Sequence, residues 1–308
     1  MHVLITGATG FVGRRLCHAL HRDGHQVSAV SRSRDRTRNA MPDLAEVYPY
    51  DSDLSVPQAA LETADAVVHL AGESIGGKWT PAKKAAIMES RTQGTRALVD
   101  GIADLNGPKP HLISTSAVGY YGDRGDTALT EDAPPGDDFL AQVCLAWERE
   151  ARHAEASGAP TTIFRVGMVL GHDGGALEKM WTVFSLGAGG PLGSGLQYWP
   201  WVDIHDVVRA LQFSLDRPDL QGVFNLTAPH PARQKAFSRA LGRALCRPAL
   251  APAPSLILRL FLGEFSSEVL ASRRAVPQRL LDVGFTFEYP DLEEALEKAI
   301  RQRRGDIR

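Results

Sequence analysis

Cysteine is scarce in this sequence, with 3 residues among 308. Cys17, Cys144 and Cys246 lie far apart, inside segments with helical periodicity. No C-x-x-C pair is available to hold a metal or to form a redox couple, and the odd count favours a reducing compartment.

An excess of charge of either sign is also absent. The 34 Lys and Arg residues nearly balance the 36 Asp and Glu residues, and the formal net charge is −2. Nucleic acids and anionic membranes, which bind through bulk charge, are therefore disfavoured as partners. No apolar run approaches a membrane span, and the first apolar strand pattern follows Met1 too closely to leave room for a signal peptide. We expect a cytoplasmic protein that binds a small-molecule substrate.

The chain does show a regular alternation of two periodicities. With 44% hydrophobic residues, it can bury the core of one large α/β domain, with or without a smaller lobe. Short apolar runs alternate with segments whose apolar residues recur every three or four positions, the pattern of βαβ units. The predicted strands are 3–6, 26–31, 46–51, 66–71, 111–116 and 161–170, and the predicted helices are 11–23, 81–103 and 138–157. Right-handed crossovers then favour a doubly wound parallel sheet, the Rossmann fold.

Beyond residue 170 the composition changes. Residues 187–203 are rich in Gly, Pro and aromatic residues and are predicted to form an ordered loop. The elements predicted after it are helix 205–215, strand 223–226, helix 235–245 and a mostly helical tail that ends in helix 291–304. We expect residues 1–170 and 203–230 to form the Rossmann domain, and residues 171–202 and 231–308 to form a smaller, mostly helical substrate lobe.

The segment VLITGATGFVGRRL places Gly7, Gly10 and Gly13 directly after the first predicted strand and at the start of a predicted helix. In a dinucleotide-binding turn, the first glycine permits the tight turn and the second lets the backbone approach a pyrophosphate. The third lets helix and strand pack closely. The pyrophosphate lies at the helix N-terminus, where N–H groups and the positive dipole end converge. The turn therefore predicts a nicotinamide dinucleotide as cofactor.

The end of the second predicted strand indicates which dinucleotide is bound. NAD-binding proteins place an acidic residue there, about twenty residues after the glycines, to bind the ribose 2′-OH. This chain has AVSRSRDR instead, and Ser31, Arg32 and also Arg34 offer a hydroxyl and guanidinium groups suited to a 2′-phosphate. NADP(H) is therefore favoured over NAD(H), the alternative being a solvated basic loop.

Several longer blocks are similar to a known family. They are HLAGESIGGKWTPAKKAAIMESR, STSAVGYYGDRGD, DDFLAQVCLAWE, RVGMVLGHDGGALEKM, GAGGPLGSGLQYWPWVDIHD and, near the C-terminus, GFTFEYPDLEEALE. The chain resembles the extended short-chain dehydrogenase/reductases, and within them an atypical subgroup labelled epimerase family protein or nucleoside-diphosphate-sugar epimerase. That label itself rests on analogy between folds, so it does not identify a substrate.

The resemblance, together with the two turns above, implies a set of site residues. Ser116 matches the hydroxyl that polarises the reacting carbonyl or alcohol in the family, although without the resemblance it would be a common turn residue. Leu70, Ala71 and Gly72 match the segment that lines the nicotinamide side. The full set of predicted cofactor contacts is Gly7, Thr9, Gly10, Phe11, Val12, Ser31, Arg32, Leu70, Ala71, Gly72, Ser114 and Arg165.

Typical members of the family next carry a Tyr-x-x-x-Lys pair, in which Tyr transfers the proton. The Lys, on the same helical face, lowers the pKa of the Tyr and binds the ribose. Counting back from Trp147, these positions fall on Leu140 and Cys144. Leu140 has no proton to transfer, and Cys144 lies on an apolar stripe and is interpreted as a core residue. The alternative, a redox-sensing or nucleophilic Cys144, requires exposure and a positive neighbour.

Substitutes for the missing pair lie nearby in the sequence. Tyr120 and Tyr121 follow Ser116, and a phenol there can act as an acid if a cation stabilises its phenolate. Lys84 is the predicted cation, on the helix that also carries Arg91, where extended members more often have Asn. The alternative is that the tyrosines pack in their loop and the lysine lies on a solvated helix end.

Two further segments are candidates for substrate recognition, although both can be packed surface loops. The first is Glu73 with the Gly-rich segment SIGGKW that follows it. The second contains residues 197–199, Gln-Tyr-Trp, whose rings and amide suit a sugar or an aromatic ring. In the adjoining WVDIHDV segment we prefer a structural role for Asp206, as an acid at a helix N-terminus.

Two functions follow from these observations. The first is an NADP(H)-dependent oxidoreductase or epimerase of the extended short-chain dehydrogenase/reductase type, acting on a small polar, sugar-like substrate. The second is a catalytically silent NADP(H)-binding sensor or regulatory protein. Loss of Tyr and Lys favours the sensor, whereas Ser116, the loop tyrosines and the substrate lobe favour the enzyme. We prefer the enzyme, because the cofactor supplies the hydride chemistry and the protein supplies orientation and a proton route.

Overall fold

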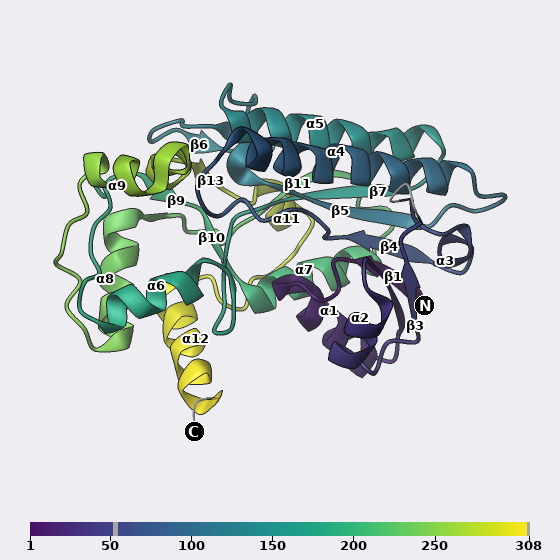
Figure 1. The fold of residues 1–308 in the computed structure, drawn as a ribbon, viewed down its shortest axis with the longest axis horizontal. Coiled ribbons are helices and arrows are strands. Elements are labelled where there is room, and N and C mark those ends of the chain that lie inside the picture. The colour runs from purple at the N-terminus through teal and green to yellow at the C-terminus, as the bar shows by residue number, and fades with distance from the viewer. Residues whose placement is uncertain (52–54, 307–308) are drawn as a thin grey trace.

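The computed structural model describes residues 1–51 and 55–306. Its centre is a seven-stranded parallel sheet in the order β11-β7-β5-β4-β1-β2-β3 (Figure 1). The strands are β1 (His2–Thr6), β2 (Gln26–Ser31), β3 (Glu46–Pro49), β4 (Ala66–His69), β5 (His111–Ala117), β7 (Thr161–Val166) and β11 (Gly222–Leu226). The predicted doubly wound parallel sheet is confirmed. Its strand order reverses between β1 and β4, and ligands of such sheets bind at the carboxyl ends of the strands at this point.

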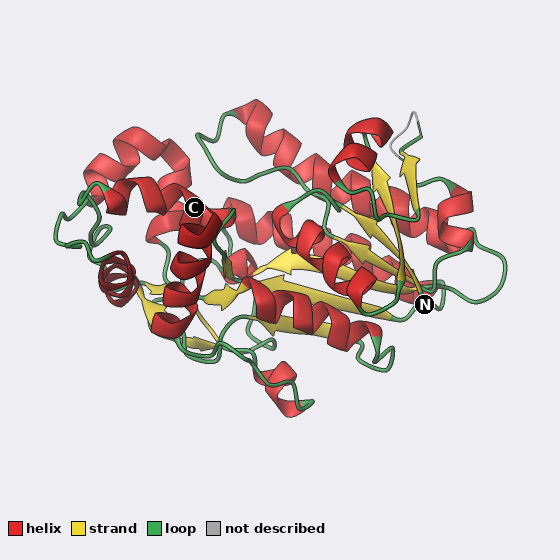
Figure 2. Cartoon of the chain, turned by 90° about the horizontal axis from the view of Figure 1, so that it is seen from below, coloured by secondary structure: helices red, strands yellow, loops and turns green. Residues whose placement is uncertain are grey.

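Helices cover both faces of the sheet. On one face α1 (Phe11–Arg22) packs beside α7 (Ile204–Leu215), and on the other α4 (Pro81–Ala103) packs beside α5 (Phe139–Ala156) (Figures 1 and 2). Two shorter helices, α2 (Arg34–Ala40) and α3 (Gln58–Glu62), lie in the connections around β3. Because both faces are covered, β1 and β4 are buried along their whole length, as expected of parallel strands.

One predicted strand is divided in the structure. The segment 161–170 was expected to be continuous, but it breaks at Gly167 into β7 and β8 (Met168–Leu170). A Cβ on Gly167 would lie 2.7 Å from the carbonyl oxygen of Pro200, so only glycine allows this close backbone approach. After the break β8 leaves the central sheet and pairs with β10 (Trp201–Asp203).

A second apolar cluster lies beyond the carboxyl edge of the sheet, at the left of Figure 1. Its helices are α6 (Gly175–Ser185), α8 (Gln234–Leu245) and α12 (Leu292–Asp306), which pack around Trp201 and Phe237. The remaining elements of the C-terminal half and its neighbours are β6 (Ala128–Leu129), β9 (Tyr198–Trp199), β12 (Ala232–Arg233), α9 (Ser255–Leu262), η2 (Gly263–Phe265), α10 (Ser266–Leu270) and β13 (Arg274–Ala275). Helix α11 (Gln278–Asp282) packs against β11 of the central sheet instead. The ordered loop predicted over 187–203 thus contains two short strands.

Carboxylates at the start of α7 hold the C-terminal segment in place. Asp203 caps the helix and accepts a hydrogen bond from Nζ of Lys298 at 2.7 Å. Asp206 accepts from the backbone N–H groups of Glu288 at 2.8 Å and Tyr289 at 2.9 Å. The structural role predicted for Asp206 is confirmed by these bonds.

The part of the chain that the structure describes contains no helix long and apolar enough to cross a membrane. Those residues also contain no group of three or more His, Cys, Asp or Glu side chains placed to hold a metal ion.

Candidate active site

The glycine turn lies between β1 and α1, at the point where the strand order reverses. Gly7 has a φ of +76°, and a Cβ there would lie 2.9 Å from the backbone of Leu70 and Ala71. A Cβ on Gly13 would lie 2.3 Å from the carbonyl oxygen of Gly7. Only glycine fits at either position, so the turn lies directly against the end of β4 and α1 rests on the turn.

The N-terminus of α1 is suited to a bound anion. Its N-cap residue, Gly10, makes no side-chain hydrogen bond to the helix, and the first turn contains no acidic residue. Thr9 and Gly10 are exposed at this end. A helix start without a side-chain cap offers its first backbone N–H groups to a ligand, and the helix dipole favours negative charge there. These residues therefore fit the pyrophosphate of a dinucleotide.

Phe11 and Val12 direct their side chains into the protein. The ring of Phe11 packs into the turn 171–175, where a Cβ on Gly174 would lie 2.4 Å from it. Arg15 stacks on the ring, with its Cζ 4.8 Å from the centroid. Val12 packs against the main apolar core. The backbone groups of Phe11 and Val12 are thus the parts that can meet a pyrophosphate.

The arginines that follow β2 differ in their ion-pair partners. Arg34 donates to Glu46 at 3.0 Å, whereas Arg32 is exposed and has no carboxylate within ion-pair distance among residues 1–51 and 55–306. The hydroxyl of Ser31 lies 2.7 Å from that of Thr37 and so holds the turn between β2 and α2. The guanidinium group of Arg32, rather than that of Arg34, is therefore available to a ligand.

Hydrogen bonds tie the end of β4 to β1. Oγ1 of Thr6 lies 2.7 Å from Nδ1 of His69 and accepts from the backbone N–H of Ala71 at 3.3 Å. Nε2 of His69 lies 3.0 Å from Oγ1 of Thr95. Burial lowers the pKa of His69 to about 4, so the ring is neutral and connects the two strands. These bonds bring residues 70–72 to the glycine turn, beside the other predicted cofactor contacts.

Two serines of β5 lie on the same face of the strand, Ser114 in its middle and Ser116 near its end. The hydroxyl of Ser114 is buried, and no partner for it occurs in the described part of the chain. Oγ of Ser116 donates to Glu148 at 2.8 Å, and Glu148 accepts from Nε and Nη2 of Arg165, both at 2.8 Å. Arg165 was predicted to contact the cofactor, but a guanidinium inside a buried strand needs a counterion, and this one is paired with Glu148.

The two tyrosines differ in their surroundings. Tyr121 is fully buried, donates to Oδ1 of Asn225 at 2.7 Å and accepts from Arg165 at 2.9 Å. Burial raises its pKa to about 12. Tyr120 is half-buried, with Cζ of Arg165 3.4 Å from its ring centroid. The contacts of Tyr121 are those of a structural residue and argue against its predicted acid–base role. Tyr120 is the phenol that remains for one.

The two positions that usually hold Tyr and Lys are filled by packed side chains. A Cβ on Gly119 would lie 3.3 Å from Cβ of Leu140 and 3.7 Å from Sγ of Cys144. Cys144 is 3% exposed, and burial raises the pKa of its thiol to about 12. A reactive thiol needs access and a lowered pKa, so the interpretation of Cys144 as a core residue is confirmed.

Lys84 faces a distant segment of the chain rather than the tyrosines. Its Nζ donates to Glu264 in η2 at 2.6 Å and lies 4.5 Å from the ring centroid of Phe139. Among the residues that the structure describes, Lys84 forms no hydrogen bond, ion pair or ring contact with Tyr120 or Tyr121. Lys84 therefore does not support a phenolate as predicted, because its ammonium group pairs with Glu264 and links α4 to η2.

The candidate recognition loop over 187–203 is mostly packed. Gln197 donates to a backbone carbonyl at 3.0 Å, and Trp199 donates to another at 3.1 Å. Tyr198 is half-buried, and Cζ of Arg233 lies 4.5 Å from its ring centroid. Arg274 also lies over this ring, with its Cζ 5.5 Å from the centroid, so Tyr198 contacts two arginines.

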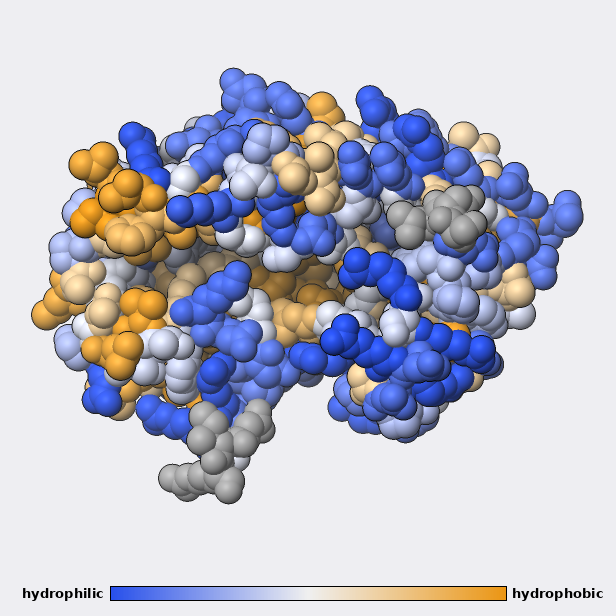
Figure 3. All heavy atoms as spheres, viewed as in Figure 1, coloured by the Kyte–Doolittle hydropathy of each residue, from blue (hydrophilic) through white to orange (hydrophobic). Residues whose placement is uncertain are grey.

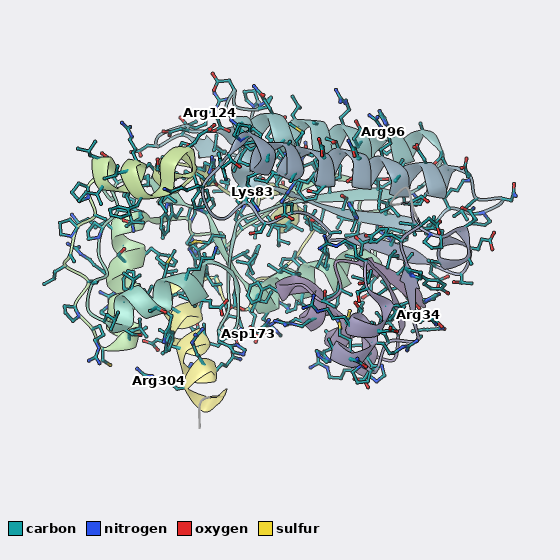
Figure 4. All side chains as sticks on the ribbon, in the orientation of Figure 1. Arg34, Lys83, Arg96, Arg124, Asp173 and Arg304 are labelled. Atoms are coloured by element: carbon teal, nitrogen blue, oxygen red, sulfur yellow. The ribbon has the colours of Figure 1, made fainter. Side chains whose placement is uncertain are left out.

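The carboxyl ends of β1, β4 and β5 face a hollow at the centre of the molecule. Figure 3 shows this hollow with apolar residues at its floor and polar residues around its rim. Lys83, near the centre of Figure 4, donates to Glu73 at 2.6 Å. From α6, Nζ of Lys179 approaches so closely that a Cβ on Gly76 would lie 2.6 Å from it. The Gly-rich loop after Glu73 therefore lies between the sheet and α6.

Glu148 was missed as a site residue, although the sequence held a signal for it. It lies one helical turn after Cys144 on a largely apolar stripe, and Arg165 lies inside an apolar strand. Ionised side chains on two buried elements are expected to pair with each other, because an unpaired buried charge is costly. This rule predicts the ion pair without knowledge of the fold.

Comparison with known proteins identifies the family of the chain. Residues 3–227 match the model of the NAD dependent epimerase/dehydratase family, and residues 253–299 match a domain of unknown function, DUF1731. The second match includes η2 with Glu264 and the buried Arg273.

The relatives are similar over nearly the whole chain. The epimerase family protein SDR39U1 homolog, chloroplastic, of Arabidopsis thaliana is 39% identical over 306 residues, which cover 98% of this chain and 87% of that protein. Epimerase family protein YfhF of Bacillus subtilis is 35% identical, with 99% of each chain covered. The crystal structure of human epimerase family protein SDR39U1 (isoform 2) with NADPH is 32% identical, has a TM-score of 0.88, and is matched over 98% of this chain and 99% of that chain. The resemblance expected from the sequence is confirmed, and the chain belongs to the NAD dependent epimerase/dehydratase family.

Proposed function

We propose that this protein is an NADP(H)-dependent oxidoreductase or epimerase that acts on a small polar substrate. The observation that carries the proposal is the guanidinium group of Arg32, which is exposed and has no carboxylate partner among the described residues. It lies at the end of β2, the strand next to the glycine turn, where the 2′-phosphate of NADP(H) is bound in this fold. The human relative was crystallised with NADPH, which supports the same cofactor.

The residues around the hollow divide the work of binding. The backbone at Gly10 and Phe11 would hold the pyrophosphate, Arg32 the 2′-phosphate, and residues 70–72 the nicotinamide side of the cofactor. When bound, the nicotinamide accepts or supplies a hydride. The hydroxyl of Ser114, in the middle of β5, is buried and has no hydrogen-bond partner among the described residues.

Ser116 and Tyr120 are the proposed groups for proton movement. The proton of Ser116 is donated to Glu148, at 2.8 Å, so toward a substrate hydroxyl the Ser116 oxygen acts as an acceptor. This orientation suits oxidation of an alcohol more directly than polarisation of a carbonyl. Tyr120 provides the phenol, and the guanidinium group of Arg165 lies against its ring, with Cζ 3.4 Å from the ring centroid.

A specific observation also favours the second candidate, a catalytically silent NADP(H)-binding sensor. Leu140 and Cys144 pack against Gly119 where the family places its proton donor and lysine. In a sensor the dinucleotide site is retained, while the network around Glu148 and Arg165 serves only the fold.

The experiment is a titration of the purified protein with NADPH and NADH, followed by nicotinamide fluorescence, in the wild type, Arg32→Ala and Arg34→Ala. We expect Arg32→Ala to weaken NADPH binding about ten- to a hundredfold, the value of a charge-assisted hydrogen bond, and to leave NADH binding unchanged. Arg34→Ala is the matched control, because its guanidinium is paired with Glu46. Equal binding of NADPH and NADH by the wild type contradicts the proposal.

Turnover separates the two candidates. We expect the enzyme to oxidise bound NADPH in the presence of a carbonyl or nucleotide-sugar substrate from a screened panel, and Tyr120→Phe to abolish this without loss of NADPH binding. A sensor binds NADPH equally well and oxidises none of it.

A further inference from the structure

A second arginine beside the hollow lacks a carboxylate partner. Arg91, in α4, is half-buried, and its Nη1 donates to the backbone carbonyls of Glu73 at 2.9 Å and Ile87 at 3.2 Å. Its Cζ lies 5.0 Å from the ring of Trp147. Within residues 1–51 and 55–306 it forms no ion pair with a carboxylate.

Other arginines at buried or half-buried carboxylates are satisfied differently. Arg165, Arg273 and Arg96 each donate two hydrogen bonds to one glutamate, at distances from 2.7 to 3.0 Å. Arg96 lies on α4 as well, little more than one turn beyond Arg91. Withdrawing a guanidinium from water is unfavourable unless a counterion or sufficient acceptors replace the water. Arg91 therefore retains a charge that a ligand can neutralise.

The surroundings of Arg91 hold an excess of positive charge. The nearest carboxylate, Glu73, is already bonded to Lys83 at 2.6 Å. The pKa of Glu73 is lowered by its hydrogen bond to Lys83 and by the charges of Lys83, Arg32 and Arg91, so three cations surround one carboxylate. Lys179 approaches the same loop from α6 and has no acidic partner in the described part of the chain. An anion that enters the hollow is attracted by this field.

Arg91 is uncovered on the side of β4. A Cβ on Gly72 would lie 3.4 Å from Cζ and from Nη2 of Arg91, so the absence of a side chain at position 72 leaves the guanidinium accessible. The other titratable groups that interact with Arg91 from β4 and α5 are uncharged at neutral pH, since burial lowers the pKa of His69 to about 4 and raises that of Cys144 to about 12.

We infer that Arg91 is the anion-binding residue of the hollow, and that it holds a carboxylate or phosphate group of the substrate beside the end of β4. The substrate then carries this group near its reacting carbon. The inference rests on the proposed function, because that function places the substrate next to residues 70–72. A phosphate of the cofactor has the same chemistry, so the experiment must distinguish the two sources.

The probes are inorganic phosphate and oxalate, titrated separately into NADPH-saturated protein and followed by the fluorescence of bound NADPH. The variants are Arg91→Gln, Arg91→Lys and the matched control Arg96→Gln. We expect saturable binding of one or both anions by the wild type, about tenfold weaker binding by Arg91→Gln, partial recovery in Arg91→Lys and no change in Arg96→Gln. Equal anion affinity in the wild type and Arg91→Gln, or no saturable binding by the wild type, overturns the inference.

The affinity of each variant for NADPH identifies the source of the anion. We expect Arg91→Gln to bind NADPH as the wild type does. If Arg91→Gln loses NADPH affinity instead, Arg91 binds the cofactor and the assignment to the substrate is wrong. If the wild type does not bind NADPH, the proposed function fails, and comparison of anion binding by nucleotide-free wild type and Arg91→Gln still decides the role of Arg91.

Discussion

The two sides of the hollow use their polar groups differently. On the side of β1, β2 and β4, the start of α1 has no side-chain cap and Arg32 has no carboxylate partner among the described residues. On the side of β5 and β7, the groups of Ser116, Glu148, Arg165 and Tyr121 satisfy one another. In a binding site some hydrogen-bond donors have no partner in the protein and can bind a ligand, whereas in a structural network the donors are paired with other protein groups. The structure therefore supports dinucleotide binding more strongly than it supports proton transfer.

The largest loss of stability is expected when an ion pair in the network on the side of β5 and β7 is removed. Arg165→Ala leaves Glu148 buried without a counterion, and loss of one partner of a buried ion pair costs about 3–5 kcal/mol. We expect this loss in the free energy of unfolding, measured by urea titration. Arg217→Ala is the control, because Arg217 and Asp219 form an exposed pair and no measurable change is expected. Equal stability of the two variants would show that the network is not structural.

On the side of β1, β2 and β4, a methyl group added to the glycine turn is expected to cause the next largest loss of stability. Gly13→Ala places a Cβ 2.3 Å from the carbonyl oxygen of Gly7, and such overpacking costs about 1–3 kcal/mol. We expect the variant to be destabilised and to lose NADPH binding. Gly94→Ala, within α4, meets no atom within 4 Å and is expected to gain about 0.5–1 kcal/mol, because glycine weakens a helix. Equal melting temperatures of Gly13→Ala and the wild type would contradict the packing of this turn.

The two adjacent tyrosines allow a test of which phenol is structural, because their variants are expected to differ in stability. Tyr121→Phe removes buried hydrogen bonds to Asn225 and Arg165, and we expect a loss of about 1–3 kcal/mol. Tyr120→Phe removes a half-buried hydroxyl, and we expect stability close to that of the wild type. If Tyr120→Phe is the less stable of the two, the assignment of roles is reversed.

The stability difference between the wild type and Tyr121→Phe also depends on pH. Burial raises the pKa of Tyr121 from 10.0 to about 12, so folding favours the neutral phenol. Its contribution is fully present below the unfolded pKa and is lost as pH rises through the folded pKa. Urea titrations should therefore show a constant difference up to about pH 10 and a decline above it. A difference that grows above about pH 10 would contradict burial of the neutral form.

Thiol labelling leaves the stability of the protein unchanged and measures how many cysteines are accessible. Cys246 is exposed, whereas Cys17 and Cys144 are buried and burial raises both of their pKa values to about 12. In the native protein we expect an aromatic disulfide reagent at neutral pH to react with Cys246 alone, and in the unfolded protein with all 3 cysteines. Rapid labelling of Cys144 in the native protein would reopen its role as a nucleophile.

The local features of the cofactor side could be predicted from the sequence. Strand and helix periodicities are local, and the spacing of Gly7, Gly10 and Gly13 directly reflects the geometry of one turn. The choice of Arg32 over Arg34 could not be predicted, because it depends on Glu46, a residue of the neighbouring strand.

The chemistry of the other side depends on contacts between distant segments. Lys84 was predicted to support a phenolate, but it pairs with Glu264, 180 residues away. Tyr121 is fixed by Asn225 in β11, 104 residues away. A local pattern shows which side chains are present, but not which of them a distant element will satisfy.

Hydrogen–deuterium exchange with and without NADPH tests the difference between the two sides most directly. The account predicts that NADPH slows exchange at the first turn of α1, at the end of β2 and in residues 70–76, because these segments offer groups to the ligand. Exchange in α5 and around Tyr121 should change little. Protection centred on α5 and Tyr121, with none at the glycine turn, would contradict the account.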